Sequence, residues 1–356
     1  MAREDINKSI RHIVKRKNYC TFNTRFVQTK SKKILIFHFS KYRFPSCCHL
    51  FKGIIISILF LITFPSVMAQ QSSNITHYMF MNMAFNPAVA GSNDGISVTG
   101  LIRQQWIGYK DDNGGNTAPQ TLFFTIDSPL KFLHGGIGGT VISDIIGPFN
   151  NTQATLCYAY RADVGPGVLS GGLQVNFINS KLNVDKLEPL VPITNLGKND
   201  FVVDGSLGML YKVPDKYYLG LSCDNVIQTL MTQIEVRNKR VYDLTGGYNW
   251  VLPGLPAYEL QPSALISTDL SAYTFSISAI LLYNKKFWGG LAYRYQDAAS
   301  MLVGFNIKAF KIGLSYDASV SKMSRYNDGS VEVMLNYCFK IQTEKFRKTY
   351  KNTRFL

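Results

Sequence analysis

The sequence predicts an all-β fold, a transmembrane outer-membrane β-barrel of about 14 antiparallel strands. Three observations support this prediction. Most of the chain after residue 93 consists of short segments in which apolar residues alternate with small or polar ones. An export signal precedes these segments, and the longer links between them fall at one end of the predicted sheet. Alternation with period two is typical of a strand that has one apolar face.

The alternation is clearest near the C-terminus, where Val331 and Val333 alternate with Glu332 and Met334. A strand is predicted wherever such a segment is bounded by turn residues. The fourteen predicted strands are 94–107, 119–128, 134–144, 150–161, 167–178, 201–212, 216–226, 239–250, 256–268, 272–284, 287–296, 300–308, 311–318 and 329–339.

The links between predicted strands differ in length at the two ends of the sheet. Links that leave even-numbered strands have about two to five residues, whereas every long link leaves an odd-numbered strand, the longest being 179–200 and 227–238. Outer-membrane barrels have short periplasmic turns and longer external loops. Only a closed sheet satisfies all its backbone polar groups in hydrocarbon. A soluble exported β-sandwich is the alternative fold.

The N-terminal part resembles an exported precursor. A basic flank at Lys52 is followed by an apolar run from Ile54 to Phe64 and by Val67-Met68-Ala69, which predicts a signal peptide over 50–69 with cleavage after Ala69. The run is shorter than the roughly 20 residues of a membrane-spanning helix. Residues 1–49 do not fit a signal peptide and are interpreted as a doubtful extension from a start codon assigned too early. The predicted location is the outer membrane of a Gram-negative cell.

The formal charge of +15 is concentrated at the two ends of the chain. Residues 70–339 hold 19 basic and 20 acidic side chains, so nucleic-acid binding has no support in the predicted folded body. The predicted parts are a pre-barrel segment (70–93), the barrel (94–339) and a basic periplasmic tail (340–356). The cysteines after Ala69 are too few and scattered for a disulfide framework.

The sequence lacks the residue patterns that catalysis or cofactor binding would need. After Ala69 only His77 and His134 remain, and both are interpreted as interfacial or turn residues. The run 111–115 (DDNGG) lacks the spacing and distal Glu of a calcium-binding EF-hand and is interpreted as a solvated external loop. We therefore predict no enzyme activity, no metal and no cofactor.

The stretch YMFMNMAFNPAVAGS, residues 78–92, is an apolar segment that precedes the first strand. Asn86-Pro87 predicts a turn, and Gly91 permits entry into the strand. Its Met and Phe side chains need cover. A plug or docking segment in the lumen and a simple clasp at the base of the barrel are both consistent with the sequence.

Arg103 and Trp106 lie three residues apart on the first predicted strand, so they are expected to face opposite sides. We predict that Arg103 points into the lumen and that Trp106 faces lipid at the external girdle. An Arg103 facing carboxylates would hold the barrel wall or a plug. A solvated lumenal arginine without a partner is the other possibility.

Several blocks together resemble the PorP/SprF family. Tyr78-Met79-Phe80, Asn86-Pro87-Ala88 and Ala90-Gly91 are similar to its "QYM…NPAYAG" motif, although His77 and Val89 stand where the motif has Gln and Tyr. Further blocks follow in the family's order: Arg103 to Gly108 (RQQWIG), Ile146-Gly147-Pro148 with Asn151-Thr152, Tyr158-Ala159-Tyr160-Arg161, Gly289 to Arg294 (GGLAYR) and Ser315-Tyr316-Asp317.

The resemblance implies a non-catalytic outer-membrane component of the type IX secretion and gliding machinery of Bacteroidetes-type bacteria, assisting the secretion or surface attachment of client proteins. It implies outer-membrane lipids, periplasmic ring and lipoprotein subunits, and a secreted surface protein as partners. A passive outer-membrane porin or channel is the alternative function. The candidate plug or partner residues are Tyr78, Met79, Phe80, Asn86, Pro87, Gly91, Arg103, Trp106, Gly108, Tyr293 and Arg294.

Overall fold

The computed structural model describes residues 28–29, 32–33, 74–93, 95–110, 118–183, 199–232, 234 and 236–340. The chain divides into two units, Met1–Pro65 and Ser66–Leu356. The described residues of the first unit form one antiparallel pair, β1 (Gln28–Thr29) and β2 (Lys32–Lys33). The predicted signal peptide with its cleavage point, the 111–115 loop and the tail beyond Lys340 lie outside the described residues.

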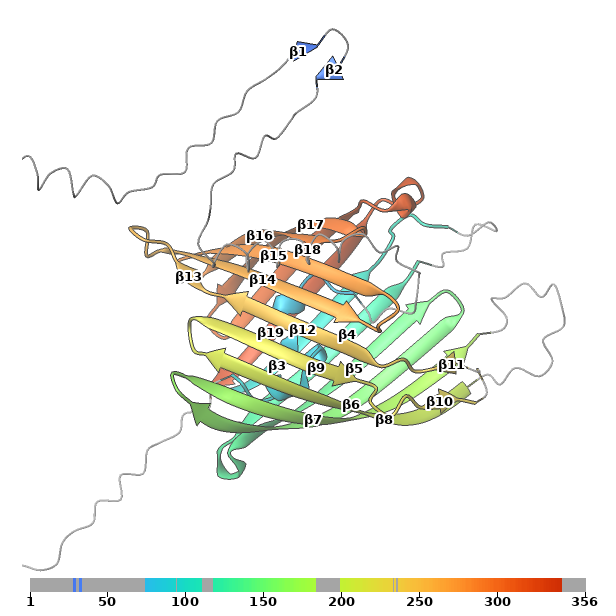
Figure 1. Ribbon diagram of the computed structural model, residues 1–356, viewed down its shortest axis with the longest axis horizontal. Helices are drawn as coiled ribbons and strands as arrows, with labels where there is room; N and C mark the ends of the chain where they lie inside the picture. Colours follow the sequence, from blue (N-terminus) through green and yellow to red (C-terminus); the bar gives the residue numbers. More distant parts are fainter. Residues whose placement is uncertain are drawn as a thin grey trace, which may run out of the picture. The chain divides into compact units, whose positions relative to one another are not determined.

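The second unit is a closed antiparallel barrel of 14 strands (Figure 1), as the sequence predicts. The strands are β3 (Gly95–Gln104), β4 (Gln120–Leu130), β5 (Gly135–Ile146), β6 (Phe149–Val164), β7 (Gly167–Leu182), β8 (Asn199–Val213), β9 (Tyr217–Asp224), β12 (Val241–Tyr248), β14 (Tyr258–Thr268), β15 (Tyr273–Tyr283), β16 (Phe287–Arg294), β17 (Ala298–Ile307), β18 (Phe310–Ser319) and β19 (Ser330–Lys340). A two-residue strand, β13 (Trp250–Val251), also pairs with β14.

The barrel closes where its last strand pairs with its first. β19 runs antiparallel to β3 from Val331 opposite Gln104 to Lys340 opposite Gly95. On the other side of the sheet, β12 pairs with both β9 and β14. Each strand of the ring therefore has a partner on both sides, as a sheet in hydrocarbon requires.

The strands place their apolar residues outside and their polar residues inside. On β4, Leu122, Phe124 and Ile126 are exposed, whereas Thr121, Phe123 and Thr125, which alternate with them, are buried. The other strands repeat this arrangement, so the exterior carries most of the exposed Leu, Ile, Val and Phe. A soluble sandwich buries its apolar faces. The soluble β-sandwich alternative is therefore wrong, and the pattern is that of a barrel whose solvent is lipid.

The strand ends that the longer links join all lie at one end of the barrel. β3 and β4 are joined by 105–119, β7 and β8 by 183–198, β9 and β12 by 225–240, and β18 and β19 by 320–329. The third of these contains a small hairpin, β10 (Leu230–Met231) with β11 (Val236–Arg237), and the fourth contains the 3-10 helix η7 (Lys322–Arg325). At the opposite end, η5 (Lys131–Leu133) forms the turn before β5. No helix in the described part of the chain is long and apolar enough to cross a membrane.

Residues 74–93, hereafter the inner segment, lie inside the barrel (Figure 1). They form three short 3-10 helices, η2 (Tyr78–Phe80), η3 (Asn82–Ala84) and η4 (Pro87–Val89). The side-chain oxygen of Asn86 accepts a hydrogen bond from the backbone N–H of Ala88 and caps η4. Most of the segment is buried, and its partners come from strands around the ring.

Candidate functional site

The start of the inner segment is held by a group of buried polar side chains, hereafter the anchoring cluster: Thr76, His77, Arg103, Arg294, Asp317 and Glu332. Its centre is Arg103 on β3. The guanidinium donates one hydrogen bond to Asp317 Oδ2 at 2.7 Å and another to Glu332 Oε1. These carboxylates project inward from β18 and β19, the two strands that follow β3 around the ring. Arg103 thus points into the lumen and faces carboxylates there.

Both carboxylates also hold the inner segment. The backbone N–H of Thr76 donates to Glu332 Oε1 at 2.7 Å, and that of His77 donates to Oε2 at 3.1 Å. His77 Nδ1 lies 2.8 Å from the same Oε2. The Thr76 hydroxyl donates to Asp317 at 2.7 Å. Each carboxylate therefore bridges Arg103 to the inner segment.

Arg294, at the end of β16, is the second arginine of the cluster. Its guanidinium pairs with Asp297 at 2.7 Å and donates to the Thr76 hydroxyl oxygen at 3.2 Å. Removing one partner of a buried ion pair typically costs about 3–5 kcal/mol, because the other charge stays desolvated and unpaired.

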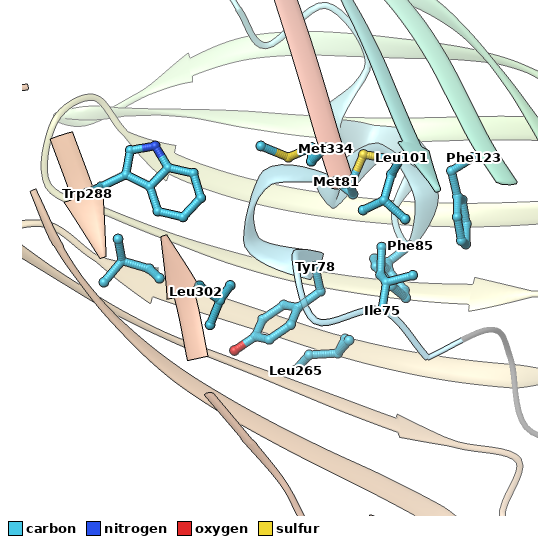
Figure 2. Packing of buried hydrophobic residues seen from close by; sticks show 11 residues of the cluster. Ile75, Tyr78, Met81, Phe85, Leu101, Phe123, Leu265, Trp288, Leu302 and Met334 are labelled. Atoms are coloured by element: carbon cyan, nitrogen blue, oxygen red, sulfur yellow. The ribbon is translucent and has the colours of Figure 1, made fainter. Parts of the chain in front are cut away.

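Apolar side chains of the inner segment pack against apolar side chains of the barrel wall (Figure 2). Ile75, Tyr78, Met81 and Phe85 pack against residues of the barrel wall. These wall residues are Leu101, Phe123, Leu265, Ile280, Trp288, Leu302 and Met334. The Phe80 ring lies 4.9 Å from that of Trp288, centroid to centroid. Large side chains thus fill the lumen on this side.

Tyr78 adds two polar contacts to this packing. Its hydroxyl donates to the Ser263 carbonyl at 3.0 Å and lies 3.1 Å from the Ser278 hydroxyl. Burial raises the pKa of the Tyr78 phenol above its ordinary value. The phenol therefore remains a neutral hydrogen-bond donor.

The Asn-Pro turn of the inner segment rests on a patch of three glycines, hereafter the glycine platform: Gly172 on β7, Gly208 on β8 and Gly220 on β9. A Cβ on Gly208 would lie 2.9 Å from Pro87 Cδ and even closer to Asn86 Oδ1. A Cβ on Gly220 would lie 2.8 Å from Asn86 Nδ2. Only glycine lets the turn approach the wall this closely.

Asn86 uses this close approach to bind the wall backbone. Its amide nitrogen donates to the carbonyl of Met209 at 2.9 Å and to that of Leu221 at 3.3 Å. The Ser222 hydroxyl donates to the Phe85 carbonyl at 2.6 Å. The Asn-Pro turn is therefore fixed by shape and by hydrogen bonds, without a charged partner.

Gly91 ends the inner segment in a conformation that requires glycine. Its φ is +62°, and a Cβ there would lie 2.6 Å from the carbonyl oxygen of Ser128. Its backbone N–H donates to Asp127 Oδ2 at 2.9 Å, and the Arg161 guanidinium donates to the carbonyl of Ala90. The chain then enters β3.

The remaining candidate residues lie elsewhere. Met79 lines a hollow on the short-turn side of the segment. Tyr293 is on the exterior, 41% exposed. Gly108 has a φ of +79° in the link after β3. The prediction that Trp106 lies on the first strand is wrong, because β3 ends at Gln104 and Trp106 has a φ of +51° beyond it. Strand alternation therefore does not determine which way Trp106 faces. Its ring neighbours Tyr109 in the same link.

The sequence prediction missed several residues that complete the site. His77 was expected at an interface or turn, yet it is fully buried and bound to Glu332. Glu332 and Asp317 were recognised only as parts of strands. Alternation already placed Glu332 on the inward face of the last strand, and closure of the barrel brings that strand beside Arg103.

The inner segment separates two hollows that share no lining residue. The larger, hereafter the outer cavity, has a volume of about 510 Å³ and lies toward the long links, with Met83, Ala84 and Phe85 on its boundary. The smaller, of about 220 Å³, lies toward the short turns and is bounded by Met79 and Phe80. Among the described residues, no group of His, Cys, Asp and Glu is arranged to hold a metal ion.

A closed antiparallel barrel with an apolar exterior and a polar interior has the architecture of an outer-membrane β-barrel protein. The chain belongs to the PorP/SprF family, because the family model described as type IX secretion system membrane protein PorP/SprF matches residues 67–337. The motif resemblance is thereby confirmed. No curated protein matches the chain significantly.

The solved structures to which this chain is similar include several outer-membrane proteins. The outer membrane protein Omp33 of Acinetobacter baumannii is 9% identical, with 69% of this chain and 98% of that chain covered and a TM-score of 0.41. The toluene transporter TbuX of Ralstonia pickettii is 13% identical, with 73% and 93% covered and a TM-score of 0.45. The KdgM porin is 12% identical, with 68% and 99% covered and a TM-score of 0.35.

Proposed function

We propose that this protein is a non-catalytic outer-membrane component of the type IX secretion and gliding machinery, and that it assists the secretion or surface attachment of client proteins in a Bacteroidetes-type cell. Family membership supports the secretion role. In this proposal the chain reaches the outer membrane after cleavage of a signal peptide at Ala69, and its barrel serves as a closed scaffold.

The observation that carries the closed-scaffold proposal is the double attachment of the inner segment. The anchoring cluster fixes its start to β18, β19 and β3, and the glycine platform seats the Asn-Pro turn on β7, β8 and β9. A segment held on opposite sides of the lumen suits a plug better than a clasp at the base. A passive porin would need an open path past it.

Two regions outside the plug are proposed to contact partners. The client would meet the links 179–200 and 227–238 on the cell exterior. The N–H groups of Ile227 and Thr229 in the second link donate hydrogen bonds to Asp204 on β8, which attaches this part of the link to the barrel wall. Ile227 is nevertheless 67% exposed and offers an apolar contact. The basic tail 340–356 would meet a periplasmic ring or lipoprotein subunit.

Conductance in planar bilayers tests the plug. The full-length protein should be silent, and a variant that lacks 70–91 should conduct because the lumen loses its filling. A channel in the full-length protein would favour the porin function. Silence in both forms would reduce the inner segment to a clasp.

Surface proteomics of the source bacterium tests the secretion role. Deleting the gene should deplete particular surface proteins, and the intact gene should restore them. Removing 341–356 should leave a heat-modifiable barrel on a gel but reduce recovery of periplasmic partners in a pull-down. An unchanged surface proteome would contradict the secretion role, and unchanged recovery would contradict the role of the tail.

A further inference from the structure

The outer cavity contains polar groups that the barrel itself does not use. Thr140 on β5 and Thr155 on β6 are directly opposite each other in the sheet, and both line the cavity. Each is only 4% exposed. Their hydroxyl oxygens have no hydrogen-bond partner among the described residues. Buried hydroxyls without partners cost free energy, so a ligand that bonds to them would be favoured there.

The carboxylates that line the cavity are already engaged by the wall. Asp144 accepts a hydrogen bond from the Thr121 hydroxyl at 2.6 Å, and Asp243 accepts one from Ser267. Asp224 is hydrogen-bonded to Ser206. Against these three acids the lining has one basic residue, Lys239. Asp224 and Asp243 are also hydrogen-bonded to each other and so share a proton. A small excess of negative charge remains, which disfavours an anionic ligand. Because the carboxylates are already hydrogen-bonded, the neutral side chains are left to make the new contacts.

The cavity also has apolar surface close to these neutral groups. Phe85, Phe123 and Ile142 line it together with the two threonines, and Gln153 adds an amide. A pocket of about 510 Å³ is within the usual range for small ligands. A sugar ring has hydroxyls around its edge and C–H groups on its faces, which matches this combination of polar and apolar lining.

We propose that the outer cavity is a binding site for a small neutral saccharide, of about disaccharide size, that enters from the long-link side of the barrel. Its hydroxyls would bond to Thr140, Thr155 and Gln153, and a ring face would lie on the phenylalanines. The docked inner segment forms the floor of this site, so binding needs that segment in place but does not depend on the secretion role.

Isothermal titration of the purified full-length protein in detergent tests the site with four probes: maltose, chitobiose, digalacturonate and spermidine. At least one of the two neutral disaccharides should bind, and the anionic and cationic probes should bind more weakly or not at all. The double variant Thr140→Val, Thr155→Val keeps the side-chain shape and removes both hydroxyls. It should weaken binding about tenfold or more, since each lost hydrogen bond is worth several-fold in affinity.

Ser315→Ala provides the matched control. Ser315 is a buried residue on β18 whose hydroxyl also has no partner among the described residues, and it does not line the cavity. Its removal should leave the affinity unchanged. If the double variant fails to give a heat-modifiable barrel, Gln153→Leu takes its place in the test. This variant should also weaken binding, because it removes the amide from the cavity lining. The proposal is overturned if neither neutral disaccharide binds, if a charged probe binds more tightly, or if well-folded cavity variants bind as the wild type does.

Discussion

The start of the inner segment and its Asn-Pro turn, hereafter the charged end and the glycine end, are held by different means. On the β18–β19–β3 side, charged groups meet in a buried cluster, with Arg103 between Asp317 and Glu332. On the β7–β8–β9 side, three glycines leave room for the turn, and contact depends on shape and on hydrogen bonds between uncharged groups. The charged end should respond to the loss of a group, whereas the glycine end should respond to the gain of one.

Two side chains can report separately on these ends. Trp288 lies beside Phe80 and His77 near the anchoring cluster, so its emission reports the charged end once Trp106 and Trp250 are replaced by Phe. Cys157 on β6 packs with Met83, which precedes the Asn-Pro turn, and with Ala90, which follows it. With the other cysteines replaced by Ser, its rate of maleimide labelling reports the glycine end.

The largest effect is expected for Glu332→Ala. The change leaves the N–H groups of Thr76 and His77 without their acceptor and removes a charge partner of Arg103. Docking of the inner segment should weaken by about 3–5 kcal/mol. Trp288 emission should shift toward that of an exposed indole, and bilayer recordings should show openings. Glu332→Gln, which keeps an acceptor oxygen, is the control and should be affected less. An unshifted emission in the alanine variant would contradict the role of the cluster.

Gly208→Ala should act at the glycine end alone. The added methyl group would collide with Asn86 and Pro87, and overpacking of this kind costs about 1–3 kcal/mol. Cys157 should label faster while Trp288 emission stays unchanged. Gly171→Ala on β7 is the matched control, because a Cβ there meets nothing within 4 Å. A simultaneous change in both reporters would mean that the segment moves as one rigid body.

Arg294→Met should have a smaller effect on the charged end. It removes the hydrogen bond to Thr76 but leaves the contacts of Arg103 in place. The Asp297 side chain, which is 35% exposed, can be solvated when its partner is lost. We expect a loss of about 1–2 kcal/mol, seen as an earlier thermal change in Trp288 emission. A loss as large as that of Glu332→Ala would show that the two arginines act as one unit.

Tyr78→Phe should have the smallest effect, about 0.5–1.5 kcal/mol at neutral pH, from two lost hydrogen bonds. In the docked state burial raises the pKa of this phenol above its ordinary value of 10.0. The docked state therefore keeps the proton when the undocked phenol ionises, so docking should weaken as the pH rises above about 10. The phenylalanine variant should show a smaller decline over the same pH range in a Trp288 titration. Equal declines would show that other groups cause it.

The sequence predicted the barrel well because its determinants are local. Alternation fixes which residues face lipid, and turn residues bound each strand, so all fourteen predicted segments coincide with strands. The end of the first strand was placed too late for a local reason as well: the chain leaves the strand at Gln104, and Trp106 takes a left-handed conformation that hydropathy does not reveal.

The contacts of the inner segment could be predicted only in part. Alternation predicts that Arg103 faces inward, and the Met and Phe side chains of 78–92 predict that this stretch needs cover. Its partners Asp317 and Glu332 lie more than 200 positions away and meet it only through barrel closure. The glycine platform was not predicted, because a glycine within a strand can equally mark a bulge or a tight bend, and only the opposing surface distinguishes these from a close approach.

The pairing of β19 with β3 also sets an order of events during assembly. Arg103 and Glu332 stand directly opposite each other across the seam between the first and last strands. The complete anchoring cluster therefore cannot form before β19 has paired with β3. Until then the inner segment lacks its complete charged attachment, although it is synthesised before every strand of the barrel. Complete docking of this segment thus requires a closed barrel. A partner that recognises only the docked segment would therefore bind closed barrels and not incomplete ones.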